Sequence, residues 1–306
     1  MAVSSLSQDL PATKLFSGIV MYQWQGYWYP PSHLEAAMDV SKHFVAHPDD
    51  ILLAAAPKTG TTWLSALLFS IASHGLIPKE EAHKLILSTH PHELIPHLET
   101  EYKKATKLPL PRLFSTHIPY STLPEPLKDS GSRIIYVSRN PRDAFVSLWH
   151  FSQKIQRGNS DPLTFEEAFE QFCEGKTAFG PFLEHVLEYW KASQERTQNI
   201  LFLTYEEMKA DTKGGVKRMA QFLGRSIETE EEVEEIVDMC SFERLSNLEV
   251  NTSKEKSPWA FFPYNSFFRK GVVGDWVNYF TPAMTERLDR IIQAKIQGSG
   301  LQFRFE

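Results

Sequence analysis

Six consecutive apolar residues, Ile51–Ala56, stand between a pair of aspartates and a proline. A short apolar run bounded by turn residues predicts a buried β-strand. Leu64, Leu67, Leu68 and Ile71 follow at the spacing of one face of an α-helix. A strand, a tight loop and a helix in this order begin an α/β unit, in which helices cover a parallel sheet.

The same alternation recurs along the chain. Ile134–Val137 and Ile200–Leu203 predict two more buried strands. We find no linker-like stretch after residue 45, so we expect a single α/β domain over residues 31–306, with a central parallel sheet flanked by helices. Residues 1–30 are expected to be irregular. Apolar spacing predicts helices over His33–Phe44, Phe165–Phe172, Phe182–Trp190, Glu230–Met239 and Met284–Ile296, and one through Phe145, Leu148 and Trp149.

Charge and cysteine content restrict the partners and the compartment. The formal net charge is −6, so no global positive field draws the chain to nucleic acid or to an anionic membrane. Only two cysteines are present, which favours a reducing compartment over a secreted disulfide framework. The N-terminus lacks the basic start and apolar core of a signal peptide, and no apolar run approaches the ~20 residues of a membrane helix. We therefore expect a soluble, cytoplasmic protein.

The segment Pro57–Trp63, which follows the first predicted strand, has the composition of a phosphate-binding loop. Backbone N–H groups at a helix N-terminus favour an anion. Gly60 permits close backbone approach, Lys58 adds a positive charge, and Thr61 and Thr62 add hydroxyl donors. The lysine precedes the glycine, however, whereas in a Walker A loop it follows. The loop is thus P-loop-like, and an ordinary strand–helix turn with a threonine cap is the alternative.

Two other segments carry positive charge where an anion would bind. Arg139 follows the second predicted strand, and Ser147 lies about two helical turns further on. Ligands of open α/β sheets bind at the carboxyl ends of the strands. Near the C-terminus, Arg269 and Lys270 precede Gly271 on a segment with few signs of regular structure. Taken singly, Arg139 is better explained as a surface arginine paired with Asp143, and a solvated basic turn is the alternative for Arg269 and Lys270.

Together the three segments resemble the cytosolic, 3′-phosphoadenylyl sulfate (PAPS)-dependent sulfotransferase family, and the N-terminal aromatic segment is most similar to its plant branch. The resemblance covers nearly the whole chain. It implies that PAPS is the co-substrate, that adenosine 3′,5′-bisphosphate (PAP) is a product, and that no metal is required. It assigns the 5′-phosphosulfate to Lys58, Thr59, Gly60, Thr61 and Thr62, the 3′-phosphate to Arg139, Ser147, Arg269, Lys270 and Gly271, and the adenine to Trp63, Tyr205, Ser241 and Phe242.

The resemblance also identifies the catalytic residues. His117, in the segment Pro111–Pro119, matches the catalytic histidine, and an imidazole is well suited to take a proton from a hydroxyl near neutral pH. Lys58 would stabilise charge on the leaving group. Ser115 departs from the pattern, because animal members carry a lysine there. One cation is therefore missing, and more of its work is expected to fall on Lys58.

The acceptor is expected to be a small, largely apolar or phenolic molecule with a hydroxyl, bordered by the N-terminal segment through Trp28 and Tyr29, and by Phe151. Its identity stays open. The segment Ser253–Val272, with aromatics from Trp259 to Phe268, is expected to be a lid that PAP orders. Pro282 interrupts the family's dimer motif, so a monomer or a weak homodimer is expected.

Three alternatives concern other chemistry. A nucleotide-triphosphate kinase or hydrolase would use the loop at 57–63 with magnesium, but the lysine is misplaced and acidic metal ligands are missing. A non-catalytic binder of PAP would not need His117. A zinc site at His90, His92 and His97 is disfavoured, because no cysteine accompanies them and two prolines interrupt the segment, which is expected to be a loop.

Overall fold

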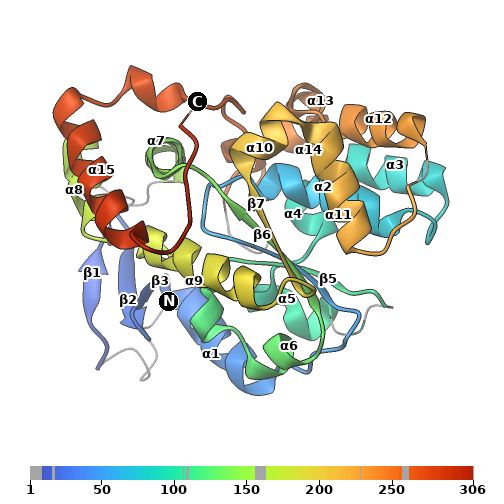
Figure 1. The fold of residues 1–306 in the computed structure, drawn as a ribbon, viewed down its shortest axis with the longest axis horizontal. Coiled ribbons are helices and arrows are strands. Elements are labelled where there is room, and N and C mark those ends of the chain that lie inside the picture. Colours follow the sequence, from blue (N-terminus) through green and yellow to red (C-terminus); the bar gives the residue numbers. More distant parts are fainter. Residues whose placement is uncertain are drawn as a thin grey trace.

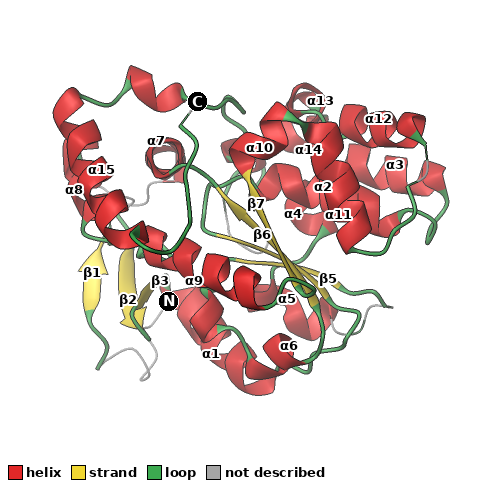
Figure 2. Ribbon diagram, in the orientation of Figure 1, coloured by secondary structure: helices red, strands yellow, loops and turns green. Residues whose placement is uncertain are grey.

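A four-stranded parallel sheet forms the centre of the protein. The computed structural model describes residues 9–15, 18–105, 107, 110–155, 163–227, 229–256 and 262–305. The strand order is β5-β4-β6-β7, and every neighbouring pair is parallel (Figures 1 and 2). The bounds are β4 Ile51–Ala55, β5 Leu113–Thr116, β6 Arg133–Ser138 and β7 Ile200–Thr204. The three strands predicted from apolar runs are thus confirmed, and the expected fold class with them.

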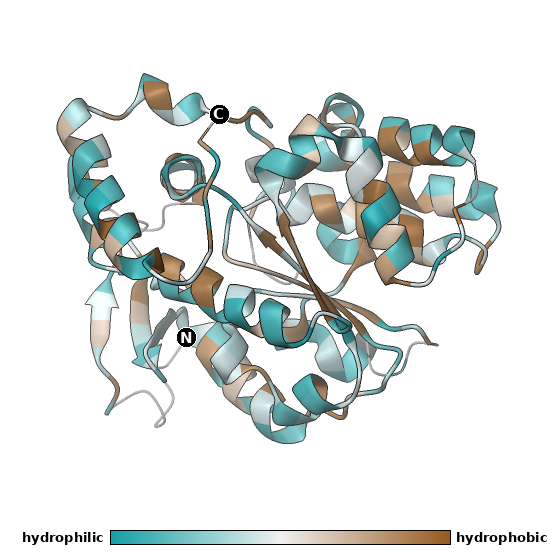
Figure 3. Ribbon diagram, viewed as in Figure 1, coloured by the Kyte–Doolittle hydropathy of each residue, from teal (hydrophilic) through white to brown (hydrophobic). Residues whose placement is uncertain are grey.

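Alternation along β4 divides the core into two layers. Ile51, Leu53 and Ala55 belong to one hydrophobic cluster, while Leu52 and Ala54 belong to the other. Successive side chains of a strand point to opposite faces, so a strand that is apolar throughout must be covered on both sides. The sheet is accordingly the most hydrophobic part of the ribbon in Figure 3.

Helices cover both faces of the sheet. The layer on the Ile51 face holds α2 Thr61–Ser73, α3 Lys79–Ser88, α10 Tyr205–Ala210, α11 Thr212–Phe222, α12 Glu230–Met239 and α13 Phe242–Asn247. The opposite layer holds α1 Pro31–His43, α5 Leu98–Ala105, α6 Glu125–Asp129, α7 Pro141–Ile155, α8 Phe165–Cys173, α9 Phe182–Glu195 and α15 Pro282–Ile296 (Figure 1). Short helices α4 Pro91–Leu94 and α14 Glu249–Thr252 and 3-10 turns η2 Tyr120–Thr122, η3 Tyr264–Ser266 and η4 Asp275–Asn278 complete the described elements.

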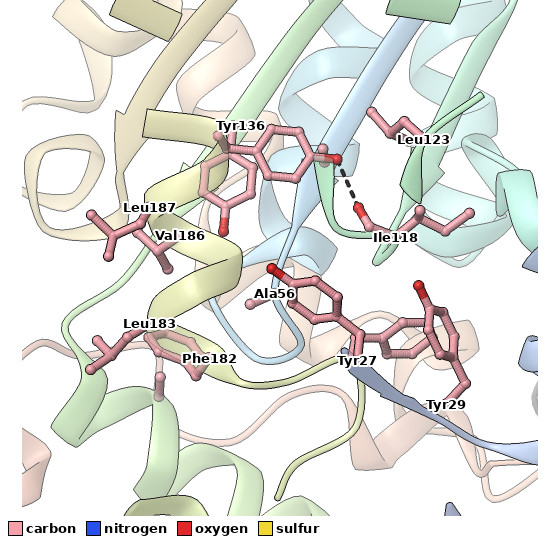
Figure 4. Packing of buried hydrophobic residues seen from close by; sticks show 14 of the residues in the cluster. Tyr27, Tyr29, Ala56, Ile118, Leu123, Tyr136, Phe182, Leu183, Val186 and Leu187 are labelled. Carbon is pink, nitrogen blue, oxygen red and sulfur yellow. Dashed lines mark hydrogen bonds between the residues drawn. The ribbon is translucent and has the colours of Figure 1, made fainter. Parts of the chain in front are cut away.

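Aromatic rings fill much of the second layer. Tyr136 of β6 stacks on Tyr189 of α9 with ring centroids 4.2 Å apart. The hydroxyl of Tyr189 donates to the carbonyl of Ile118, just beyond β5. This bond ties α9 to the carboxyl end of the sheet. Figure 4 shows the packing around it, with Tyr27, Tyr29, Phe182, Leu183, Val186 and Leu187.

The predicted helices are all present. Their ends differ from the expected ones by a few residues, most at α9, which continues to Glu195. Thr281 caps α15 by accepting from the N–H of Met284, and Pro282 occupies the first helical position. The described part of the chain contains no helix with the length and hydropathy needed to traverse a bilayer.

The N-terminal segment departs from the prediction. Residues 1–30 were expected to be irregular, but β1 Ala12–Lys14, β2 Val20–Trp24 and β3 Tyr27–Tyr29 form a small antiparallel sheet. Residues 1–8, 16 and 17 lie outside the described part. Gln25 and Gly26, both with positive φ, make the turn between β2 and β3. Strands of three residues carry too little periodicity to be recognised in a sequence.

Candidate active site

Every strand of the parallel sheet ends at a residue expected to be functional. β4 leads into the loop at 57–60, β5 into His117, β6 into Arg139 and β7 into Tyr205. Carboxyl ends of parallel strands lie at one edge, so these four segments converge there. They border one cavity of about 640 Å³. Its lining includes the predicted residues Lys58, Gly60, Thr61, Thr62, Trp63, His117, Arg139, Ser147, Phe151, Tyr205, Phe242, Arg269, Lys270 and Gly271.

Four predicted residues do not line this cavity. The Thr59 hydroxyl is buried and donates to the carbonyls of Ala56 and Val137, which holds the loop against β6. Ser241 caps α13. Tyr29 is fully buried and shares a hydrogen bond with Thr122, and Trp28 likewise lies outside the lining. Their positions therefore favour structural roles for the side chains of these four residues.

The loop at 57–60 has the backbone of an anion cradle. Gly60 has φ of +115°, and a Cβ there would lie 2.7 Å from Cδ2 of Tyr205. Only glycine therefore lets the loop pass under that ring. α2 starts directly after it, so its first N–H groups are available to an anion. Among the described residues, the buried Thr61 hydroxyl has no hydrogen-bond partner. Buried hydroxyls usually have one, so this group is able to donate to a bound anion.

Lys58 faces the cavity without a counter-charge. None of the ion pairs in the described residues includes it, and its Nζ lies 4.1 Å from the centroid of the Phe151 ring. Burial, together with the positive charges of Lys154, Arg139 and Arg269, lowers the pKa of Lys58 to about 7. A bound anion would stabilise the ammonium form of this lysine and raise its pKa.

Three of the candidate 3′-phosphate residues are cations that line the cavity. The Arg139 guanidinium lies 4.5 Å from the centroid of the Tyr205 ring and donates to the carbonyl of Val272 at 2.9 Å. Arg269 and Lys270 both pair with the carboxylate of Asp275. All three cations are thus held in place by protein groups before any phosphate binds.

Asp143 brings the two basic segments together. Its carboxylate accepts from the N–H groups of Gly274 at 2.7 Å and Trp276 at 2.9 Å. It also lies 3.6 Å from Arg139, which is the pairing considered from the sequence. The buried carboxylate therefore attaches the C-terminal segment to α7 as well as neutralising Arg139.

Gly271 lies close against the ring of Phe242, and Trp63 lines the same cavity. Gly271 has φ of +67°, and a Cβ there would lie 2.4 Å from Cδ2 of Phe242. Trp63 is oriented by a hydrogen bond from its Nε1 to the carbonyl of Cys240 at 2.9 Å. Trp63 and Phe242 both line the cavity, which suits them to contact a flat base.

The surroundings of His117 determine its tautomer. Its Nδ1 lies 2.7 Å from the carbonyl oxygen of Ala55, an acceptor only, so Nδ1 carries the proton and Nε2 the lone pair. Burial, with a smaller lowering by His97 that Glu99 and the hydrogen bond to Ala55 partly oppose, brings the pKa of His117 to about 3. The imidazole is therefore neutral near pH 7 and able to accept a proton.

The chain matches known proteins along almost its whole length. The family model described as the sulfotransferase domain matches residues 48–300. Cytosolic sulfotransferase 5 of Arabidopsis thaliana is 42% identical over 98% of this chain and 95% of its own length. The chain belongs to the sulfotransferase family. It is accordingly a PAPS-dependent sulfotransferase.

Two solved structures agree with this assignment. A sulphotransferase from Arabidopsis thaliana, 38% identical, superposes with a TM-score of 0.78 over 98% of this chain and 94% of that one. Mouse sulfotransferase SULT7A1 complexed with PAP is 28% identical and superposes with a TM-score of 0.73 over 91% of this chain and 95% of that one. The free Thr61 hydroxyl, the unpaired Lys58 and the two glycine contacts are the features of the sulfotransferase that fit such a nucleotide.

The histidine segment of the sulfotransferase differs from the expectation. His92 lies within α4, whereas His90 is its N-cap and His97 forms an isolated bridge with Ser115, so the segment is buried and only its middle is helical. Pro91 occupies the first helical position, where it starts a helix instead of interrupting one. Among the described residues no group of histidine, cysteine, aspartate or glutamate is arranged to hold a metal ion.

Several cavity residues were not singled out from the sequence. Phe179, in the turn before α9, was not considered, whereas Phe267 belongs to the aromatic segment expected to be a lid. His92 and His97 were considered only as zinc ligands, although both line the cavity. Glu99 is buried and accepts from the N–H of His117 at 2.7 Å. Only the clustering of three histidines in eight residues signalled this region.

The expected lid is described in part. Phe262, Phe267 and Phe268 line the cavity, and the hydroxyl of Tyr264 donates to Glu93 of α4. Residues 257–261, including Trp259, lie outside the described part. That PAP orders the segment Ser253–Val272 stays a prediction, and amide exchange with and without PAP tests it.

Proposed function

We propose that this sulfotransferase moves the sulfuryl group of PAPS to a hydroxyl of a small, largely apolar or phenolic acceptor, with His117 as general base. The hydrogen bond from Nδ1 of His117 to the Ala55 carbonyl carries the proposal, because it leaves Nε2 as the proton acceptor. A catalytic role for His117 also disfavours a non-catalytic PAP binder.

His117 and Lys58 divide the work of the transfer. Nε2 of His117 takes the hydroxyl proton while the acceptor oxygen forms its bond to sulfur and the bond from sulfur to the 5′-phosphate oxygen breaks. Lys58 stabilises the negative charge that develops on that leaving oxygen. Burial lowers the pKa of free His117 to about 3, and the negative charge of bound PAPS raises its basicity.

The PAPS contacts follow from the same cavity. Residues 58–62 are proposed to hold the 5′-phosphosulfate, and Trp63 with Phe242 to enclose the adenine. Arg139, Ser147 and the segment 269–271 are proposed to bind the 3′-phosphate. Lys58 supplies the positive charge that a metal ion supplies in a kinase, so we propose that no metal is required, and activity should persist in a chelator.

The acceptor end of the cavity is apolar. Ile19, Met21, Phe151, Phe179 and Phe262 line it, which supports an acceptor that is apolar around its hydroxyl. A panel of hydroxylated flavonoids, steroids, hydroxy acids and simple phenols, assayed with labelled PAPS, tests this proposal. Preference for a strongly cationic or highly polar acceptor would contradict it.

Location and assembly are proposals as well. The relative named cytosolic sulfotransferase 5 supports a cytosolic location for this enzyme. Pro282 at the first position of α15 replaces an apolar residue of the dimer motif, which supports a monomer or a weak homodimer. Light scattering over a range of protein concentrations measures the oligomeric state.

We expect affinity for PAP to fall as pH rises from 7 to 9. The pKa of Lys58 in the free enzyme is about 7, so its ammonium form is largely lost over this range while the phosphates keep their charge. If only the ammonium form binds, affinity falls by up to about 50-fold. Calorimetric titration at several pH values measures the change.

Lys58→Met is the matched control for this prediction. It should bind PAP more weakly at pH 7 and show no further loss toward pH 9. An affinity of the unmodified enzyme that stays constant between pH 7 and pH 9 would show that Lys58 is not the titrating contact.

A further inference from the structure

Three polar aromatic side chains are completely buried between the sheet and α9, and the proposed transfer uses none of them. Tyr136 lies on β6, whereas His185 and Tyr189 lie one helical turn apart on α9. All three residues are 0% exposed. Burial of polar groups is costly unless each group finds a hydrogen-bond partner. We call Tyr136, His185 and Tyr189 the α9 clamp.

The α9 clamp holds two successive carbonyl groups of the chain that leaves β5. Nε2 of His185 lies 3.0 Å from the carbonyl oxygen of His117, and the hydroxyl of Tyr189 donates to the carbonyl of Ile118 at 2.8 Å. Tyr136 connects the two α9 residues, because its hydroxyl lies 2.9 Å from Nδ1 of His185 and its ring stacks on Tyr189. Each nitrogen and each hydroxyl of the clamp therefore has a partner within the protein.

The direction of each bond in the clamp follows from the chemistry of the groups. A carbonyl oxygen only accepts, so Nε2 of His185 carries the proton in the bond to His117. Burial, partly opposed by the hydrogen bond to the His117 backbone and by the charge of Glu188, lowers the pKa of His185 to about 4. The ring is therefore neutral near pH 7, and its Nδ1 has the lone pair that accepts from the hydroxyl of Tyr136.

His117 is attached to three separate elements. Its N–H donates to Glu99 of α5 at 2.7 Å, and its Nδ1 donates to the carbonyl of Ala55 at the end of β4 at 2.7 Å. Its own carbonyl accepts from His185 of α9. Among the described residues, Nε2 is the one polar group of His117 without a hydrogen-bond partner. The attachments therefore hold the residue on every polar group except the proposed basic nitrogen.

Apolar side chains would suffice at the clamp positions if packing were their whole contribution. Replacing a buried hydrogen-bonded pair by apolar groups of the same shape changes stability little. Hydrogen bonds differ from apolar contacts because they fix the direction between two groups as well as the distance. Bonds to the carbonyls of His117 and Ile118 therefore fix the two peptide planes that follow His117, and with them the Cα that carries its ring.

We propose that Tyr136, His185 and Tyr189 are positioning residues, which hold the backbone of His117 so that its Nε2 stays directed at the acceptor hydroxyl. None of the three is among the residues that line the cavity, so they act through His117 and not on the substrate. A general base must lie within hydrogen-bond reach of the proton that it removes, and misplacement by about 1 Å can cost about 10²-fold in rate. The inference rests on the proposed role of His117 as general base.

Two substitutions of His185 separate its hydrogen bond from its bulk. The amide nitrogen of glutamine can take the place of Nε2 and donate to the carbonyl of His117, whereas leucine has no donor. His185→Leu should lower kcat by about 10- to 100-fold, and His185→Gln by no more than about threefold. Affinity for PAP, measured by calorimetry, should stay within about threefold in both variants, because the clamp lies outside the cavity lining. Equal kcat values of the two variants would overturn the proposal.

Tyr136→Phe is a milder test, because it removes one hydroxyl and keeps the ring that stacks on Tyr189. Nδ1 of His185 then has no donor, so kcat should fall by about 3- to 10-fold. Tyr102→Phe is the matched control, since Tyr102 is buried in the same hydrophobic cluster and its hydroxyl donates to Asp39 on α1. This control should leave kcat unchanged. Equal kcat values of the two tyrosine variants would contradict a positioning role for Tyr136.

Nitrogen-15 spectra of the histidine side chains test the bond directions without any substitution. Near neutral pH we expect the proton of His185 on Nε2 and the proton of His117 on Nδ1, both with and without PAP. A proton on Nδ1 of His185 would leave the carbonyl of His117 facing a lone pair. That result would overturn the proposal.

The His117→Ala background separates positioning from general support of the fold. Alanine at position 117 keeps the carbonyl that His185 binds, so a merely structural role of His185 would persist in this background. If the clamp acts through the imidazole of His117, His185→Leu should not lower the residual rate of His117→Ala any further. A further loss as large as in the unmodified enzyme would overturn the proposal. Normal turnover by His117→Ala itself would instead contradict the proposed function.

Discussion

Replacement of His117 by alanine is expected to lower kcat by about 10²–10⁴-fold, the usual contribution of a general base. The reason is geometric. The bond from Nδ1 to the Ala55 carbonyl leaves Nε2 as the basic nitrogen, and the ring lines the cavity. Because His117 contacts the acceptor and no phosphate in the proposed reaction, affinity for PAP should stay within about threefold. Initial rates with labelled PAPS and calorimetry with PAP measure the two quantities.

The control is His83→Ala, which removes a half-buried histidine of α3 that lies 3.4 Å from Glu235 of α12 and outside the cavity lining. It should leave both quantities unchanged. A His117→Ala enzyme that turns over normally would exclude His117 as the base. Loss of PAP binding together with turnover would assign His117 a structural role, since its backbone also contacts Glu99 and His185.

The second large effect is expected at the 3′-phosphate. Arg139→Ala and Arg269→Ala should each reduce the preference for PAPS over adenosine 5′-phosphosulfate by about 10- to 100-fold, because a hydrogen bond to a charged group contributes ~1.5–3 kcal/mol. The analogue lacks the 3′-phosphate, so its kcat/KM should change much less. The ratio of the two kcat/KM values is the measurement.

Arg290→Ala serves as control, because this arginine is 74% exposed and pairs only loosely with Glu286. Thermal unfolding of each variant separates loss of fold from loss of recognition, which matters at Arg139 because Asp143 lies against it in the interior. Two arginine variants that keep the preference of the unmodified enzyme would place the 3′-phosphate elsewhere.

The structure shows what surrounds Ser115, the position where the sequence departs from the lysine expected of animal members. Ser115 is fully buried in β5, and its hydroxyl donates to the carbonyl of Ile95 at 3.2 Å. Residue His97 pairs with Ser115 through an isolated bridge. A histidine therefore lies next to the strand position where the family resemblance leads us to expect a lysine in animal members.

The prediction worked best where a short segment contains both a motif and its structural context. Residues 51–63 carry an apolar strand, a glycine turn and a helix start in sequence order, so neither the strand nor the cradle depends on distant partners. Arg139 directly follows an apolar strand in the same way. By contrast, β5 has four residues, and two of them are polar. The hydroxyl of Thr116 and the N–H of His117 donate to Glu99, and this contact forms only in the folded chain.

By itself the sequence determined the family, the α/β class and 14 of the 35 residues that line the cavity, because local periodicity and motifs encode strands, loops and their ends. Tertiary structure alone decided how those ends meet: Asp143 holds the segment of Arg269 beside Arg139, and Ala55 selects the tautomer of His117. It also decided that His92 and His97 lie between Thr62 and Glu99. These contacts join residues up to 133 positions apart, and hydrogen-bond direction depends on three-dimensional partners that no local pattern contains.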